Sequence, residues 1–182
     1  MSMAASPPSS SAFTGAAVVM GVASCGKTTV GAALAERLGC RFIEGDRLHS
    51  QSNIAKMSAG TPLTDADRWP WLEQVGLALA GQGGAIAACS ALKRAYRDAI
   101  TKAAGRPVFF IHLHGSRAVL ERRIAERKGH FMPASLLDSQ LATLEMPGAD
   151  ERAITIDIAG SPQSIIAQAA SFLLQGTPHH GA

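Results

Sequence analysis

Five short apolar segments alternate with amphipathic segments along the chain. Between them, apolar residues recur at helical spacing, as in Val30, Leu34 and Leu38 before Gly39. Short buried strands that alternate with amphipathic helices are typical of a parallel sheet with helices on both faces. The pattern therefore predicts an α/β fold, a three-layer α/β/α arrangement around a five-stranded parallel sheet. The predicted strands are residues 16–20, 41–43, 85–89, 108–113 and 153–158.

The pattern also suggests where several helices begin and which side they bury. A helix is predicted to begin near Pro70, because proline suits the first helical turn. A later helix is expected to bury four leucines, which are Leu136, Leu137, Leu141 and Leu144. Ser161 and Pro162 predict the start of the last helix, with serine as its N-cap. Parallel sheets of this kind bind ligands at the carboxyl ends of their strands, so the functional residues are expected directly after the strands.

Length and composition indicate a single globular domain. The chain has 182 residues, of which 47% are hydrophobic and 17% charged, with a formal charge of +3. A single domain over residues 16–175 is expected, with flexible tails at 1–15 and 176–182 that are rich in small residues, serine and proline. The charge shows no basic stripe for nucleic acid, and no apolar run is long enough to span a membrane. Three scattered cysteines and no recognisable signal peptide favour a cytoplasmic location.

A glycine-rich motif, G-x-x-x-x-G-K-T, follows the first predicted strand and precedes a predicted helix. Backbone N–H groups of such a loop surround phosphate oxygens, and the helix N-terminus adds a positive dipole. Lys27 is expected to reach the β- and γ-phosphates, and the Thr28 hydroxyl to ligate Mg²⁺. The loop therefore predicts a nucleotide-phosphate site. Its expected nucleotide-binding residues are Gly21, Ala23, Ser24, Cys25, Gly26, Lys27, Thr28 and Thr29.

A carboxylate follows the second predicted strand. Asp46 stands where its side chain would face the γ-phosphate, and a kinase needs a carboxylate there to orient the attacking hydroxyl. A helix N-cap is the alternative interpretation. No N-K-x-D guanine motif is present in the sequence, which argues against a GTPase. The phosphate loop and Asp46 together favour a kinase.

The chain resembles the gluconate kinase family over residues 18–158, in several long segments that match in order. The segments are Gly45-Asp46-Arg-Leu-His49, the stretch 53–72 through Asp65, Arg68 and Pro70-Trp71-Leu72, Ala88-Cys89-Ser90-Ala91-Leu92-Lys93 with Tyr96-Arg97-Asp98, Arg127-Lys-Gly129-His130-Phe131-Met132-Pro133, Ser139-Gln140, and 144–152. The resemblance implies ATP-dependent phosphorylation of D-gluconate to 6-phosphogluconate. It also implies a nucleoside-monophosphate-kinase-like P-loop fold, dependence on Mg²⁺ and a homodimer. The family often has glycine where this loop has Ser24, a change that removes backbone freedom.

The acceptor-binding segment is expected at residues 46–72, together with basic residues after the third strand. Arginine suits the carboxylate of a sugar acid because it donates two parallel hydrogen bonds. Arg68, Lys93 and Arg97 are therefore candidate acceptor residues, with a solvated basic helix face as the alternative. His49 is a further candidate for the hydroxyl groups, although a lone histidine is more often structural.

A basic segment at residues 122–134 is interpreted as a lid. Mobile basic segments bring charge to the γ-phosphate and exclude water when they close. By analogy with related small kinases, Arg123 is expected to pack on adenine and Arg127 to reach the phosphates, with Arg122 turned to solvent. His130 is included among the acceptor residues. The expected catalytic set is Lys27, Asp46 and Arg127.

Two other functions compete with gluconate phosphorylation. One is a kinase of the same fold that acts on a shikimate-like or nucleotide acceptor, and the long match on the acceptor side argues against it. The other is a nucleotide-binding regulator without turnover, which the joint presence of Lys27, Asp46 and Arg127 argues against.

Overall fold

The computed structural model describes residues 13–126 and 134–176, and its centre is one parallel sheet. The sheet has five strands in the order β2-β3-β1-β4-β5, and every neighbouring pair is parallel. This confirms the predicted five-stranded sheet, and each strand lies within one residue of its predicted limits. The strands are β1 (Ala16–Met20), β2 (Arg41–Glu44), β3 (Ala85–Ala88), β4 (Val108–His114) and β5 (Ala153–Asp157).

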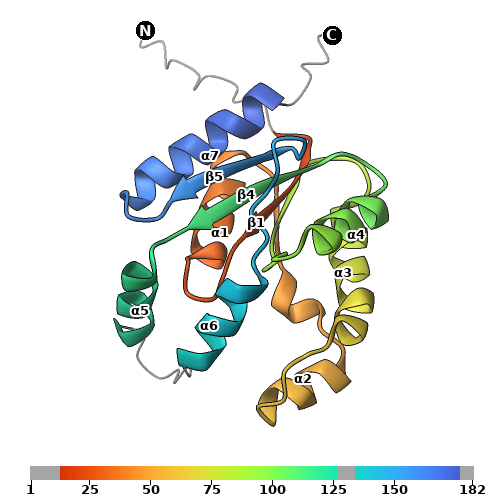
Figure 1. Ribbon diagram of the computed structural model, residues 1–182. Coiled ribbons are helices and arrows are strands. Elements are labelled where there is room, and N and C mark those ends of the chain that lie inside the picture. Colours follow the sequence, from red (N-terminus) through yellow and green to blue (C-terminus); the bar gives the residue numbers. More distant parts are fainter. Residues whose placement is uncertain (1–12, 127–133, 177–182) are drawn as a thin grey trace, which may run out of the picture.

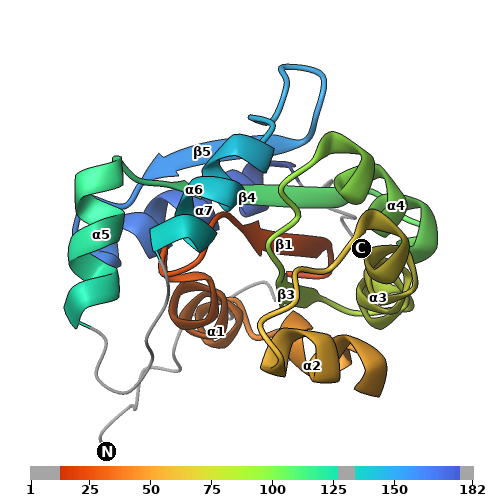
Figure 2. The same ribbon diagram turned by 60° about the horizontal axis from the view of Figure 1, so that its bottom comes forward.

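Helices cover both faces of the sheet, as the alternating pattern predicts (Figure 1). α1 and α7 pack together on one face, and α3 and α4 form a tightly packed pair on the other. α5 and α6 lie beside the loop that joins β1 to α1 (Figure 2). The helices are α1 (Lys27–Arg37), α2 (Gln51–Ser58), α3 (Asp65–Leu79), α4 (Arg94–Ala104), α5 (Arg117–Glu126), α6 (Ala134–Thr143) and α7 (Pro162–Gly176), with a 3₁₀ turn η1 (Gly45–Leu48) after β2.

The central strand β1 supplies both halves of the hydrophobic core. Ala17 and Val19 pack in the cluster on the α1 and α7 side, while Val18 and Met20 pack in the cluster on the α3 and α4 side. Successive side chains of a strand point to opposite faces, so a continuously apolar strand must be covered on both. The fully buried β1 therefore fixes where the loop after Met20 emerges from the core.

Helix α3 begins five residues before Pro70, so the predicted start is wrong. The Thr64 side chain accepts a hydrogen bond from the Asp67 backbone N–H, and the Asp67 carboxylate accepts one from the Thr64 N–H. This reciprocal capping box satisfies two of the N–H groups that a helix start leaves unpaired. The capping residues determine the start, and Pro70 lies inside the helix.

The predicted buried side of α6 is wrong at Leu136. Leu137 is buried, but the side chain of its neighbour Leu136 is 42% exposed. Adjacent residues on a helix point about 100° apart, so both leucines cannot face one narrow contact. α6 therefore touches the core through Leu137 and the partly buried Leu141, while Leu136 faces outward.

The packed chain begins before the expected boundary at residue 16. Phe13 is 2% exposed, and its backbone N–H donates to the Leu38 carbonyl at 3.0 Å. The remainder of the two predicted tails, residues 1–12 and 177–182, lies outside the described residues. Among the residues that the structure describes, no helix is long and apolar enough to cross a membrane.

Candidate active site

The loop between β1 and α1 has the backbone that a phosphate loop needs. Gly21 and Gly26 adopt φ values of 142° and 103°, in the region that glycine occupies without strain. A side chain at Gly21 would approach the Leu113 carbonyl oxygen to 2.8 Å, so the loop also lies too close to β4 for a larger residue. Both glycines of the motif are thus required by geometry.

Ser24 occupies a position that favours glycine. Its φ is 63°, and its buried hydroxyl has no hydrogen-bond partner within the described residues. A non-glycine residue in this region is strained, and an unpaired buried hydroxyl costs further free energy. Serine in place of the glycine that the family often has therefore strains the backbone at this position of the loop.

Two side chains from the start of α1 lie within this loop. The Lys27 ammonium donates to the Val22 carbonyl at 3.0 Å, which holds it over the loop. The Thr28 hydroxyl donates to the Glu44 carboxylate at 2.7 Å. Glu44 ends β2, so the carboxylate beside the predicted metal ligand comes from the second strand. The sequence analysis did not include Glu44, although a carboxylate at a strand end was a visible signal.

Three charges converge at the end of β3. Burial raises the pKa of the Cys89 thiol to about 12; the Lys27 charge lowers this pKa, and the Asp46 and Glu44 charges raise it. In the parallel register Glu44 is the partner of Ala88 at the end of β3. This is the carboxyl edge, where sheets of this kind bind their ligands.

The turn η1 places Asp46 at this edge. Gly45 packs so closely on β3 that a side chain there would meet the Ala88 carbonyl oxygen at 2.3 Å. The Trp71 indole N–H donates to the Gly45 carbonyl at 2.8 Å, which ties the turn to α3. Asp46 itself is exposed. A rigid support and an exposed carboxylate are what an acceptor-orienting residue requires.

His49 lies between η1 and α2, stacked on a tryptophan. Its ring centroid is 4.1 Å from that of Trp71, with the planes 16° apart, and Nδ1 lies 3.4 Å from the Asn53 side-chain amide. Burial lowers the pKa of His49, the Asp46 charge raises it and the Arg68 charge lowers it. Both charged residues therefore lie near the imidazole, and the packing keeps it neutral at pH 7.

Arg68 and Lys93 meet around one tyrosine where α3 and α4 begin. Lys93 donates to both carboxylate oxygens of Asp65, at 3.0 and 2.8 Å, and Tyr96 donates to the same carboxylate at 2.5 Å. Arg68 makes one weak contact, 3.4 Å from the Tyr96 hydroxyl, and its guanidinium lies 5.8 Å from the centre of that ring. Lys93 is already paired, whereas most Arg68 donors are not used by the described residues.

Arg97 is placed differently from the expectation. Its side chain is 1% exposed and forms a bidentate pair with Glu151, at 2.5 and 2.8 Å. It also donates to the carbonyl oxygens of Ala91, Leu92 and Glu145. A guanidinium in this environment joins α4 to the segment before β5 and is too deeply buried to bind an acceptor. We therefore remove Arg97 from the acceptor residues.

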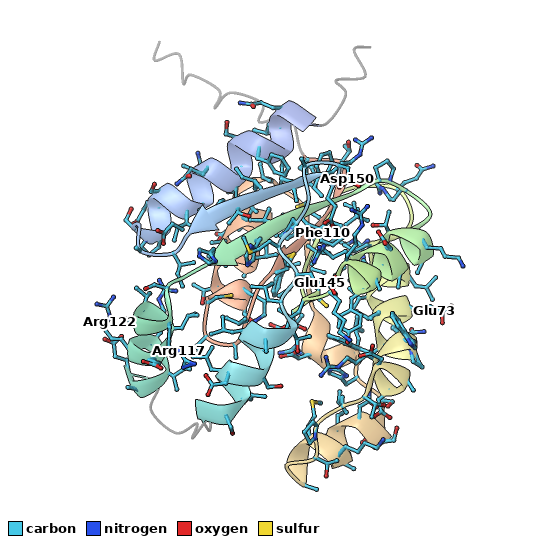
Figure 3. The ribbon with its side chains drawn as sticks, viewed as in Figure 1. Glu73, Phe110, Arg117, Arg122, Glu145 and Asp150 are labelled. Atoms are coloured by element: carbon cyan, nitrogen blue, oxygen red, sulfur yellow. The ribbon has the colours of Figure 1, made fainter. Side chains whose placement is uncertain are left out.

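The described part of the predicted lid is the end of α5. Arg123 donates to the carbonyl of Cys25 in the phosphate loop at 3.1 Å and to that of Ile158 at 2.9 Å. Its packing on adenine stays a prediction. Arg122 points away from the sheet (Figure 3). Arg127 and His130 lie outside the described residues.

Gln140 of α6 is a contact that the sequence analysis did not foresee. Its side-chain oxygen accepts from the Ala23 backbone N–H of the phosphate loop at 2.6 Å, across 117 residues of sequence. Nothing in the helical pattern distinguishes this glutamine from an exposed one. Only its place in the Ser139-Gln140 match pointed to it.

The comparisons with known proteins agree with this geometry. Residues 17–147 match a family model described as an AAA domain. The chain is 51% identical to gluconokinase of Gluconobacter oxydans over 157 residues, covering 82% of this chain and 85% of that protein. The chain belongs to the gluconokinase family. Among solved structures, a gluconokinase from Sinorhizobium meliloti matches with a TM-score of 0.84 and 49% identity, covering 90% of this chain and 94% of that one.

A second gluconokinase relative indicates how far the similarity extends. The thermosensitive gluconokinase of Escherichia coli is 46% identical over 148 residues, or 78% of each protein. The predicted fold and the family resemblance are thereby confirmed. The roles of single residues in this gluconokinase-family site rest on the geometry above.

Proposed function

We propose that this protein transfers the γ-phosphoryl group of ATP to the 6-hydroxyl group of D-gluconate, giving 6-phospho-D-gluconate and ADP. The observation that carries the proposal is 51% identity to a gluconokinase over 82% of the chain. A phosphate loop, a basic residue over it and an exposed carboxylate at the same sheet edge supply the parts that this reaction needs.

On the donor side, the loop backbone holds the phosphates and Lys27 neutralises charge between them. The Lys27 ammonium lies over the loop, 3.0 Å from the carbonyl of Val22, which places its charge beside the proposed phosphate site. Arg123 fixes α5 against the loop through the Cys25 carbonyl. We infer that Arg127 adds charge from the lid. Preorganised donors of this kind stabilise the charge that develops on the transferred group.

The oxygen ligands around Thr28 fit Mg²⁺. The Thr28 hydroxyl and the Glu44 carboxylate are 2.7 Å apart, and hard oxygen ligands are what this ion prefers. No group of three or more metal-ligating side chains occurs within residues 13–126 and 134–176, so phosphates and water would complete the coordination. When bound, the ion neutralises charge on the phosphate oxygens.

On the acceptor side, Asp46 orients the 6-hydroxyl group and accepts its proton. The hydroxyl oxygen attacks the γ-phosphorus, the bond to the β-phosphate oxygen breaks, and ADP leaves. Neutral His49 is placed to hydrogen-bond a substrate hydroxyl, and His130 is proposed for the same purpose. Arg68 binds the carboxylate, since its guanidinium makes only one 3.4 Å contact among the described residues. Lys93 supports Arg68 by holding Asp65.

Location and assembly complete the proposal. We propose a cytoplasmic location, where ATP is available. A homodimer is proposed from the family resemblance alone. Size-exclusion chromatography with light scattering tests the dimer, with a mass near 38 kDa expected, twice the 18.9 kDa of one chain.

A coupled assay tests the function itself. Purified protein is given ATP, Mg²⁺ and D-gluconate, and 6-phosphogluconate is detected through its NADP⁺-dependent oxidation. Saturable, ATP-dependent formation of this product is expected. Turnover of another sugar acid without turnover of gluconate would refute the substrate, and ATP binding without turnover of any acceptor would favour a regulator.

A further inference from the structure

One peptide unit of the phosphate loop is held from both sides. The Val22 carbonyl accepts from the Lys27 ammonium at 3.0 Å, and the N–H of the same peptide, on Ala23, donates to the Gln140 side-chain oxygen at 2.6 Å. The second contact joins the loop to α6. Fixing both ends of a peptide unit prevents it from rotating about its axis, so Gln140 determines which way this part of the loop points.

The position of this peptide relative to the nucleotide follows from Lys27. In P-loop enzymes this lysine reaches the β- and γ-phosphates. The carbonyl that Lys27 touches therefore lies beside the β- and γ-phosphates, since one side chain has to reach both. Gln140 meets the N–H of that same peptide and so lies beside these phosphates as well.

Gln140 is presented by a helix that is fixed at several points. Leu137, one turn earlier, is buried in the core. Asp138 pairs with Arg117 of α5, and the backbone beyond α6 is tied to Leu92 through the N–H of Glu145 at 2.8 Å. Figure 3 shows Arg117 pointing from α5 toward α6, and Glu145 just beyond α6. A side chain on such a support keeps its direction without a ligand.

The hydrogen bond also settles how the Gln140 amide is oriented. A backbone N–H can only donate, so the atom facing Ala23 must be the amide oxygen. The two hydrogens on the amide nitrogen then point elsewhere, and within residues 13–126 and 134–176 the structure gives them no acceptor. Gln140 is only half-buried. An amide with its oxygen fixed and its NH₂ group available suits an anionic oxygen nearby.

We propose that Gln140 is a catalytic residue that binds the γ-phosphoryl group during transfer. Its oxygen holds the Val22–Ala23 peptide, and its NH₂ group donates to a γ-phosphoryl oxygen. The inference rests on the proposed function only in taking ATP as the phosphoryl donor. It assigns α6, the helix that follows the predicted lid, a direct part in recognising the group that moves.

Two nucleotides that differ by the γ-phosphate test the proposal. In Gln140→Glu the oxygen that accepts from Ala23 is retained, but the donor becomes a second carboxylate oxygen. Isothermal titration calorimetry should show that the Kd for the non-hydrolysable ATP analogue AMPPNP rises at least about 10-fold, while that for ADP stays within roughly threefold. Gln163→Glu, an exposed change on α7, is the matched control and should alter neither.

Turnover supplies a second readout. Gln140→Leu removes both hydrogen-bonding groups, and kcat should fall about 100-fold, as for loss of one transition-state donor, with KM for gluconate little changed. Equal weakening of ADP and AMPPNP by Gln140→Glu would overturn the proposal, because it indicates a structural role. So would a kcat of Gln140→Leu near that of the unaltered protein. Normal ADP binding confirms that a variant is folded.

These outcomes are independent of the acceptor. Unaltered protein that binds AMPPNP but does not phosphorylate gluconate would refute the substrate and leave the nucleotide comparison intact. Unaltered protein that binds neither nucleotide would refute ATP as the donor, and the role of Gln140 with it.

Discussion

Arg97 and Arg68 are both basic residues from segments that match the same family, yet their surroundings are opposite. Arg97 is 1% exposed and bonds to one carboxylate and three carbonyl groups. Arg68 is half-buried, and its side chain makes one hydrogen bond to the described residues, at 3.4 Å to the Tyr96 hydroxyl. A buried charged residue that bonds to several protein groups holds the fold together, whereas a partly exposed one with unused donors can bind a ligand. The two arginines therefore differ in how many of their N–H donors remain available to a ligand.

The largest expected effect is on stability, at the buried arginine. Arg97→Met leaves the Glu151 carboxylate, which is 7% exposed, without its partner, and the free energy of unfolding should fall by about 3–5 kcal/mol. Urea denaturation measures this loss. Arg94→Met on the same helix is the control, because its partners Asp98 and Asp150 are exposed and the loss should be below about 1 kcal/mol. Equal losses of unfolding free energy in the two variants would contradict the structural role of the buried arginine.

The next effect is on catalysis, at a carboxylate that is exposed. Asp46→Asn keeps the shape of the side chain but removes the proton acceptor, so kcat should fall roughly 100- to 1,000-fold while the Kd for ATP changes by less than about threefold. Steady-state kinetics and ATP titrations measure the two quantities. Asp98→Asn, an exposed change on α4, should leave both unchanged. A parallel loss of ATP affinity would undo the role of Asp46 as an acceptor-side residue.

A smaller effect is expected from the second arginine of the comparison. Arg68→Met should raise KM for gluconate about 10- to 100-fold with a folded protein and unchanged ATP binding, because a charge-assisted hydrogen bond to the carboxylate is lost. Steady-state assays at varied gluconate measure it, with Arg37→Met at the exposed end of α1 as control. If Arg68→Met instead lowers stability as Arg97→Met does, the two arginines have the same role.

The smallest effect is expected on stability, at a buried hydroxyl group of the phosphate loop. Ser24 has a φ of 63° and a buried hydroxyl without a partner among the described residues. Ser24→Gly should therefore raise the free energy of unfolding by about 1 kcal/mol, or the Tm by roughly 2–4 °C. Differential scanning calorimetry measures the change. A lower Tm would show that the hydroxyl stabilises the loop.

The sequence predicted the features that local patterns determine. The strands follow from continuous apolar runs, and the loop after β1 follows from its glycines and Lys27. The start of α3 was missed because the capping box of Thr64 and Asp67 competes with the proline signal, and in the fold the cap prevails. Local patterns thus predict elements well and their ends less well.

The parts of the site that depend on distant contacts could not be predicted in the same way. Arg97 and Glu151 are 54 residues apart, and Ala23 and Gln140 are 117 apart, so no local pattern reveals either pair. Glu44 was missed for a different reason: Asp46, two residues later, was an equally good carboxylate. The family resemblance marked the segments that matter but not which side chains are already paired.

The central claim is that an ATP-dependent kinase of gluconate is built at the carboxyl edge of this sheet. The most direct measurement is the ³¹P NMR spectrum of a reaction with ATP, Mg²⁺ and D-gluconate. We expect ADP and a phosphomonoester signal of 6-phosphogluconate to grow together in equal amounts. ADP that accumulates with inorganic phosphate alone, or a spectrum that does not change, would contradict it.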